Sequence, residues 1–250
     1  MNRKQTFLII LSICILGFIL RLVYIQLQDC IDQDSIGYMI MAKHIANGNI
    51  AEAVKIRPEM PFLYPYTLGI LSRISGFSVE LLGWSINMIL GVGIIVLGYF
   101  FAKLIFNKKV AITASLFCAV TPLIVSSSGS LMRDTMGLFL IVLTLYLAAL
   151  TLLKNSWYKW AFAGFFGACS AMTRPDGIET LVVIPIWIIV YCCVLRKKEK
   201  NINIRNLILG FLLFLIIFLV FAIPYEKYFH KYGSSYTIFL NEKLLDNYVL

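Results

Sequence analysis

Charged residues are scarce in this sequence of 250 residues: they make up 14%, against roughly 25% in an ordinary soluble domain. Hydrophobic residues make up 60%, and the mean hydropathy is +0.85. These values exclude a water-soluble enzyme, a disordered tail and a secreted disulfide scaffold. The net charge of +9 alone would suggest nucleic acid, but the basic residues lie in short clusters between long apolar runs. That pattern is typical of a membrane protein, and we expect no nucleic-acid partner.

Cysteine and histidine also offer little chemistry. Apart from Cys30, the cysteines lie inside apolar runs, where cysteine behaves as a small hydrophobic residue, so a disulfide framework has no partners to use. The two histidines, His44 and His230, are far apart in the sequence, which disfavours a histidine metal site. The sequence also lacks a glycine-rich phosphate loop and a Cys/His metal cluster.

Seven apolar segments are long enough, or nearly so, to cross the roughly 30 Å of bilayer hydrocarbon. They are residues 6–27, 82–106, 110–128, 135–153, 160–173, 178–195 and 205–223. The first is interpreted as a retained span rather than a signal peptide, because no small-residue cleavage site follows it. The predicted fold is therefore all-α, a polytopic membrane bundle of about seven helices over residues 1–223. Residues 224–250 are expected to begin an extracytoplasmic segment that is truncated.

The distribution of basic residues predicts the orientation. With a cytoplasmic N-terminus, the inner segments hold 12 basic residues and one acid, and the outer segments hold 10 basic residues and 12 acids. Short cytoplasmic loops are enriched in Lys and Arg, as this arrangement requires. The polar chemistry is then expected to face outward, in a first loop at 28–81 that carries amphipathic helices. A bacterial or archaeal plasma membrane is the expected location.

The first outer loop begins with an acidic stretch that contains Asp32 and Asp34. Ser35 or Asp34 is predicted to cap a helix that ends near Asn47, which places Asp34 at a helix N-terminus. A carboxylate in that position can act as the general base for an acceptor hydroxyl. The alternative is a solvated turn followed by an ordinary helix cap.

The same loop continues with Arg57 and then a stretch rich in proline and aromatic residues, which leads into a second short helix that ends near Gly76. An arginine at the start of such a stiff interfacial segment can bind a phosphate. The alternative is an interfacial anchor with an arginine that reaches to the headgroups, and Arg21 at the end of the first span is interpreted in this second way.

Two short outer turns each carry an arginine and an aspartate between apolar spans. One contains Arg133 and Asp134, and the other contains Arg174 and Asp176. Ionisable groups at membrane depth are costly and mark a functional site or a buried ion pair. Both interpretations, a phosphate site and a self-neutralising Arg–Asp pair, stay open.

The order of these pieces resembles the GT-C superfamily of membrane glycosyltransferases, and within it the protein O-mannosyltransferase and lipid A aminoarabinose transferase group. The resemblance covers about residues 15–195. The matching motifs are Arg21-Leu22-Val23-Tyr24, Asp32-Gln33-Asp34-Ser35-Ile36-Gly37-Tyr38, Arg57-Pro58 to Tyr64-Pro65, Ser130-Leu131-Met132-Arg133-Asp134 and Thr173-Arg174-Pro175-Asp176-Gly177. Many relatives have Asp-Glu where this sequence has Asp34-Ser35, and relatives are usually longer.

The resemblance implies a polyprenyl-phosphate sugar donor, an acceptor that is a lipid, a glycan or a protein, and transfer with inversion on the extracytoplasmic side. It implies that Asp34 is the catalytic carboxylate, with Asp32 as the alternative, and that Asp134 is the second carboxylate of the site. Substrate-binding residues by the same resemblance are Arg57, Arg133, Arg174, Tyr38 and Tyr64. A divalent cation is a possible cofactor, with Asp32, Asp34 and Asp134 as its oxygen ligands.

Two other functions fit parts of the pattern. A transporter or flippase for a lipid-linked sugar would use the same arginines without needing a base, although it should show inverted repeats or broken helices at mid-membrane, which the sequence lacks. A non-catalytic assembly subunit would use the long outer loop to bind a partner.

Overall fold

A computed structural model describes residues 2–28, 32–154, 158–195 and 204–238 of the chain, and all regular elements in these ranges are helical. The α-helices are α1 (Arg3–Leu27), α2 (Gln33–Ala46), α3 (Ile50–Ile56), α4 (Leu63–Ser75), α5 (Val79–Ile105), α6 (Lys108–Val120), α7 (Pro122–Gly129), α8 (Asp134–Lys154), α9 (Tyr158–Thr173), α10 (Thr180–Leu195) and α11 (Ile204–His230). A short 3-10 helix, η1 (Pro175–Glu179), precedes α10. The predicted all-α membrane bundle is confirmed.

Five helical segments among the described residues are long and apolar enough to cross a membrane. They are Arg3–Leu27, Val79–Ile105, Asp134–Leu153, Pro175–Cys193 and Arg205–His230. The bent pair formed by α6 and α7 passes the same test when the two helices are taken together, which gives up to six. The prediction of about seven also counts the segment at 160–173, which is α9. Its 16 residues are fewer than the roughly 20 of a typical span, but α9 leads from the end of α8 back to Arg174, which pairs with Asp134 at the start of α8.

The predicted span at 110–128 is not one straight helix. Lys108–Val120 and Pro122–Gly129 meet at an angle of 52°. Thr121 between them has an extended backbone, with φ −62° and ψ 119°. A proline disfavours helical geometry in the residue before it and has no N–H to continue the helix, so Pro122 starts a new helix in a new direction.

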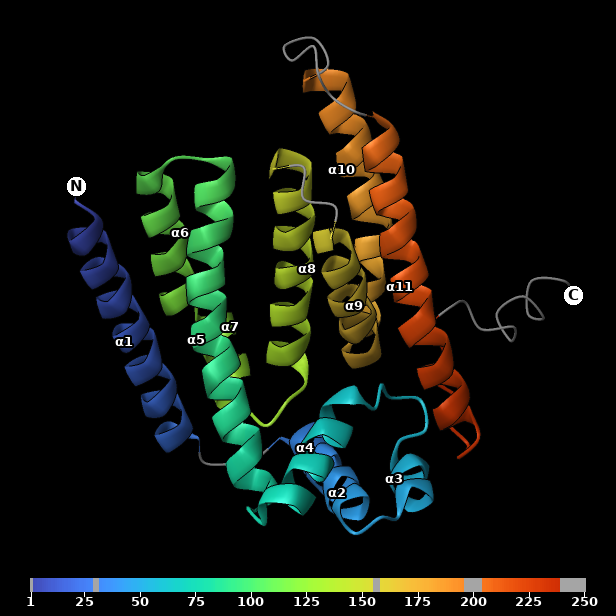
Figure 1. Cartoon of the computed structure of the whole chain (residues 1–250). Coiled ribbons are helices and arrows are strands. Elements are labelled where there is room, and N and C mark those ends of the chain that lie inside the picture. The colour runs from blue at the N-terminus through green and yellow to red at the C-terminus, as the bar shows by residue number, and fades with distance from the viewer. Residues whose placement is uncertain (1, 29–31, 155–157, 196–203, 239–250) are drawn as a thin grey trace, which may run out of the picture.

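Three short helices, α2, α3 and α4, gather at one end of the bundle, opposite the end at which α1 begins (Figure 1). We call this the loop end. Helices α2 and α4 pack closely because Gly69 has no side chain: a Cβ there would lie 2.7 Å from the carbonyl oxygen of Ala42. Gly76 ends α4 in the left-handed conformation with φ 73°, as the sequence predicted. The predicted loop 28–81 is therefore a helical cap, of which residues 29–31, including Cys30, lie outside the described residues.

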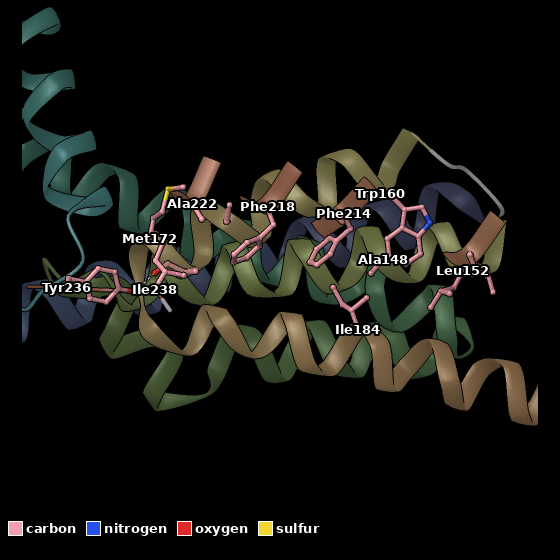
Figure 2. Close-up of a cluster of buried hydrophobic side chains, with 14 residues drawn as sticks. Ala148, Leu152, Trp160, Met172, Ile184, Phe214, Phe218, Ala222, Tyr236 and Ile238 are labelled. Carbon is pink, nitrogen blue, oxygen red and sulfur yellow. Dashed lines mark hydrogen bonds between the residues drawn. The ribbon is translucent and has the colours of Figure 1, made fainter. Parts of the chain in front are cut away.

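Helices α8 to α11 form a second packed unit, whose buried side chains include Trp160, Phe214 and Phe218 (Figure 2). Glycines let α9 and α11 approach closely, since a Cβ at Gly210 would lie 2.2 Å from the Trp160 ring. Small residues at helix contacts are the usual means of association within a bilayer, where lipid tails are as apolar as leucine. Helix α11 continues past residue 223, the predicted end of the last span, to His230.

Arg21 lies inside the bundle and does not reach toward the headgroups, which corrects its interpretation as an anchor. Its side chain is fully buried, and Nη1 donates a hydrogen bond to the carbonyl oxygen of Gly17 at 2.7 Å. Gly91 on α5 leaves the space that the guanidinium fills, because a Cβ there would lie 2.6 Å from Arg21 Nε. Hydropathy alone does not distinguish an arginine that reaches to the headgroups from one that is buried in the bundle, because both lie near the end of an apolar helix.

Candidate functional site

Asp34 and Arg57 form an ion pair at the loop end. Arg57 Nη1 donates to Asp34 Oδ1 at 2.5 Å. Helix α2 begins at Gln33 with Asp32 as its N-cap, so the prediction that Ser35 or Asp34 caps the helix was wrong. Asp34 still lies in the first turn, where the partial positive charge of a helix N-terminus favours a carboxylate. Asp32 is exposed, whereas Asp34 is half-buried and points to a partner, so Asp34 is the better placed of the two carboxylates.

A glycine one turn after Asp34 makes room for the arginine. A Cβ at Gly37 would lie 3.2 Å from Arg57 Nε, which is tighter than ordinary contact. The guanidinium therefore lies directly against the backbone of the helical turn that carries its carboxylate partner. Sequence reasoning did not assign this role to Gly37.

The same arrangement occurs at the start of α8. Asp134 is the first residue of that helix, and Arg174 donates to Asp134 Oδ1 through Nη1 and to Asp176 Oδ2, at 2.6 Å, through Nη2. Gly137 stands three residues after Asp134, and a Cβ there would lie 2.5 Å from Arg174 Cδ. The sequence signal that links the two places is Asp-x-x-Gly, which reads Asp34-Ser-Ile-Gly37 in α2 and Asp134-Thr-Met-Gly137 in α8.

Arg133 differs from the other two arginines of the site. Its guanidinium carbon lies 5.8 Å from the centre of the Tyr38 ring, and its Nη1 is buried without a hydrogen-bond partner. A buried donor that lacks a partner costs roughly 1–3 kcal/mol, so an acceptor brought by a ligand would relieve that cost. Among the described parts of the chain, Arg133 is the site arginine with such a free buried donor.

Tyr38 lies close to both places, since it follows Asp34 by four residues in α2 and Arg133, next to Asp134, lies over its ring. Burial raises the pKa of its phenol, and the charges of Arg133, Asp34, Asp134 and Arg57 all act on the same group. The contact between Tyr38 and Arg133 thus links the Asp34–Arg57 pair to the turn that carries Asp134, about a hundred residues away in sequence. Tyr64 packs its ring against Tyr38 edge to face, with centroids 5.7 Å apart. The structure brings these five predicted residues together: Asp34, Arg57, Arg133, Asp134 and Tyr38.

Asn87 fixes the turn that carries Arg133, and sequence reasoning missed it. Its Nδ2 lies within hydrogen-bonding distance of Tyr64 Oη at 3.1 Å, of the Ser130 carbonyl at 2.6 Å and of the Met132 carbonyl at 2.9 Å. Asn87 is fully buried in α5. The available signal was an asparagine inside an otherwise apolar span, which is costly in a bilayer unless its amide is bonded.

The segment after α11 braces the loop that carries Arg57. The carbonyl oxygen of Pro58 accepts hydrogen bonds from Ser234 Oγ at 3.0 Å, from the Ser235 amide at 2.9 Å and from the Tyr236 amide at 3.1 Å. Tyr236 Oη in turn donates to the Ala171 carbonyl at 2.6 Å. Residues from the end of the described chain thus hold the residue next to Arg57. No local sequence pattern indicates a contact over this separation.

The three carboxylates that were proposed as metal ligands are not clustered. Asp34 is paired with Arg57, Asp134 is paired with Arg174, and Asp32 is exposed at the helix cap. Within the described ranges, no group of three or more His, Cys, Asp or Glu side chains is arranged to hold a metal ion.

Residues 59–223, more than half of the chain, match the family model described as dolichyl-phosphate-mannose-protein mannosyltransferase. The chain belongs to this mannosyltransferase family. It is accordingly a membrane glycosyltransferase of the GT-C type, as its motifs predicted, in a family whose description names a lipid-linked sugar donor. Arg133, Asp134 and Arg174 lie inside the range that matches the mannosyltransferase model, while Asp34 and Arg57 precede it. No curated protein matches the chain.

Proposed function

We propose that this chain transfers a sugar from a polyprenyl-phosphate donor to an acceptor hydroxyl on the extracytoplasmic side of the membrane, with inversion at the anomeric carbon. The family supports a lipid-linked donor. The observation that carries the proposal is the free buried Nη1 of Arg133, beside the Asp34–Arg57 pair at the loop end.

Arg133 is the proposed ligand of the donor phosphate. Arg174 already donates to two carboxylates, whose negative charges oppose a phosphate at that guanidinium. Arg133 can give a hydrogen bond to a phosphate oxygen without losing one. Arg57 is the proposed second ligand, since its single carboxylate partner leaves donors of its five-donor guanidinium available.

Asp34 is the proposed general base. As the acceptor hydroxyl attacks the anomeric carbon, its proton passes to the Asp34 carboxylate, and the bond between the anomeric carbon and the phosphate oxygen breaks. The bonding electron pair stays on the polyprenyl phosphate, whose growing negative charge Arg133 and Arg57 stabilise. Tyr38 and Tyr64, whose rings pack edge to face beside Arg133, are proposed to contact the sugar.

Transfer of radiolabelled mannose from polyprenyl-phosphate mannose, measured in membranes that contain this chain, tests the proposal. Asp34→Asn should lower transfer by roughly 10²–10⁴-fold, the usual contribution of a general base, and should leave donor binding intact. Glu52→Gln is the matched control, because Glu52 is an exposed loop-end carboxylate paired with Lys55. Undiminished turnover by Asp34→Asn would remove Asp34 from the mechanism.

The phosphate assignment and the orientation have separate tests. Arg133→Ala should weaken donor binding, and Arg73→Ala, which removes an exposed arginine from the end of α4, should not. Reporter fusions after residues 50 and 200 should report opposite sides of the membrane, and the same side for both would overturn the proposed orientation.

A further inference from the structure

A cavity of about 400 Å³ opens between α7 and α8, beside the turn that carries Arg133. Its walls have two kinds of chemistry. Asp134, Arg174 and Asp176 form one side, and Leu123, Leu138 and Ile141 are among the apolar residues of the other. The cavity is therefore shaped for a molecule that is polar at one end and apolar at the other.

The polar side of the cavity has a formal charge of −1, because one guanidinium stands between two carboxylates. Each of the two terminal nitrogens of Arg174 donates a hydrogen bond to one of those carboxylates. A phosphate brought here would meet net negative charge and an arginine whose strongest partners are taken. A hydroxylated head group without charge meets carboxylate oxygens that accept hydrogen bonds and guanidinium nitrogens that donate them.

The apolar side continues into the membrane region. Ile141 follows Asp134 by seven residues in the spanning helix α8, a distance of about 10 Å along the helix axis. Leu123 on α7 is 77% exposed and also lines a second groove, of about 540 Å³, between α1 and α7. The apolar wall is thus continuous with a surface that faces lipid tails, and a molecule can enter the cavity sideways from the bilayer.

We infer that this cavity binds the acceptor, and that the acceptor is a membrane-anchored amphiphile with an uncharged, hydroxylated head group and no phosphate in that head group. The inference rests on the proposed function, since it assigns the second substrate of the same site. The head group lies against Asp134, Arg174 and Asp176, next to the donor position at Arg133, and the chain lies along Leu138 and Ile141. A water-soluble peptide acceptor would leave this apolar wall unused.

Photolabelling of the full chain in lipid nanodiscs tests the inference. The probes are a decyl glucoside and a decyl phosphate, each with a diazirine in its alkyl chain, and the labelled residues are located by peptide mass spectrometry. We expect the glucoside to label residues 123–127 and 138–141 saturably, and the phosphate probe not to do so. Leu138→Trp, which fills the cavity, should abolish this labelling. Leu153→Trp, a lipid-facing change at the other end of α8, should preserve it.

A charge variant gives a second test that does not depend on filling the cavity. Asp176→Lys changes the formal charge of the polar side from −1 to +1, and labelling by the phosphate probe should then appear at residues 138–141. Non-saturable labelling by the glucoside, its survival in Leu138→Trp, or strong labelling by the phosphate probe in the unchanged protein would overturn the inference. Neither probe requires donor or turnover, so failure here is distinguishable from failure of the Asp34 and Arg133 tests.

Discussion

Tyr225 on α11 accepts a hydrogen bond through Oη from the backbone amide of Phe62, at 2.6 Å, across 163 positions of sequence. The same hydroxyl donates to the Met172 carbonyl at 3.2 Å. One phenol therefore joins the loop-end cap to α9 and α11. Since Arg57 and Pro58 lie only a few residues before Phe62, this contact helps to set where the Asp34–Arg57 pair stands relative to Arg174.

Removing that hydroxyl should loosen the loop end. Tyr225→Phe leaves the Phe62 amide without its partner, and we expect stability to fall by about 1–3 kcal/mol, the cost of an unsatisfied buried group. Thermal unfolding in detergent measures the effect. Tyr228→Phe, on a side chain that is 40% exposed, is the control and should change stability by less. Equal unfolding temperatures for the two variants would contradict a bracing role for Tyr225.

The two glycines that accommodate arginines should respond differently to alanine. Gly137→Ala brings a Cβ to 2.5 Å from Arg174 Cδ, so the arginine has to move away from Asp134. Gly37→Ala brings a Cβ only to 3.2 Å from Arg57 Nε, and helix propensity favours alanine by about 1 kcal/mol. We expect Gly37→Ala to keep or raise the unfolding temperature and Gly137→Ala to lower it, with loss of transfer activity most severe in Gly137→Ala. A lower unfolding temperature for Gly37→Ala than for Gly137→Ala would show that the distance between the new Cβ and the arginine does not decide stability.

Asn87→Ala should destabilise the turn before α8. The change removes the two amide hydrogens that Tyr64 Oη and the carbonyls of Ser130 and Met132 share, at about 1–3 kcal/mol for each group left unsatisfied. Denaturant-induced unfolding measures the loss. The matched control is Asn49→Ala, since Asn49 is exposed and its side chain makes no capping hydrogen bond. If the two variants were equally stable, the amide of Asn87 would have no such role.

Alkaline pH should destabilise the protein partly through Tyr64. Burial raises the pKa of this phenol above its ordinary value of about 10, so the folded protein retains a proton that the unfolded chain gives up. The contribution to stability is complete below pH 10 and is lost as pH rises from there toward the folded-state pKa. Unfolding temperatures measured from pH 8 to pH 11 should therefore fall less steeply in Tyr64→Phe than in the unchanged protein. Parallel curves would contradict this.

Much of the architecture was predictable because it depends on local composition. Apolar length and flanking charge predicted the membrane helices, and the positions of Asn47, Gly48 and Gly76 predicted the ends of α2 and α4. The bend that Pro122 introduces into the predicted span at 110–128 was not predicted. Hydropathy averaged over a window does not resolve such a bend.

The residues of the site were predictable, but their partners were not. Arg57, Arg133 and Arg174 stood out because charge is rare between apolar spans. Which of them is paired depends on contacts between distant segments: Arg174 meets both Asp134 and Asp176, and Arg133 keeps a free nitrogen. Asn87 and Tyr225 were not predicted because their hydrogen-bond partners come from distant segments, and the local sequence around an isolated polar residue in a helix does not indicate such partners.

The Asp-x-x-Gly turn has a dynamic consequence. In α2 and in α8, a single first turn of helix carries both the carboxylate and the bare backbone against which the arginine lies. Unwinding that one turn moves both the aspartate carboxylate that pairs with the arginine and the glycine backbone against which the guanidinium lies. Opening of a few backbone hydrogen bonds at the start of α2 would therefore free Arg57 from its carboxylate partner in one step, whereas Arg174 would keep its bond to Asp176 when the first turn of α8 opens.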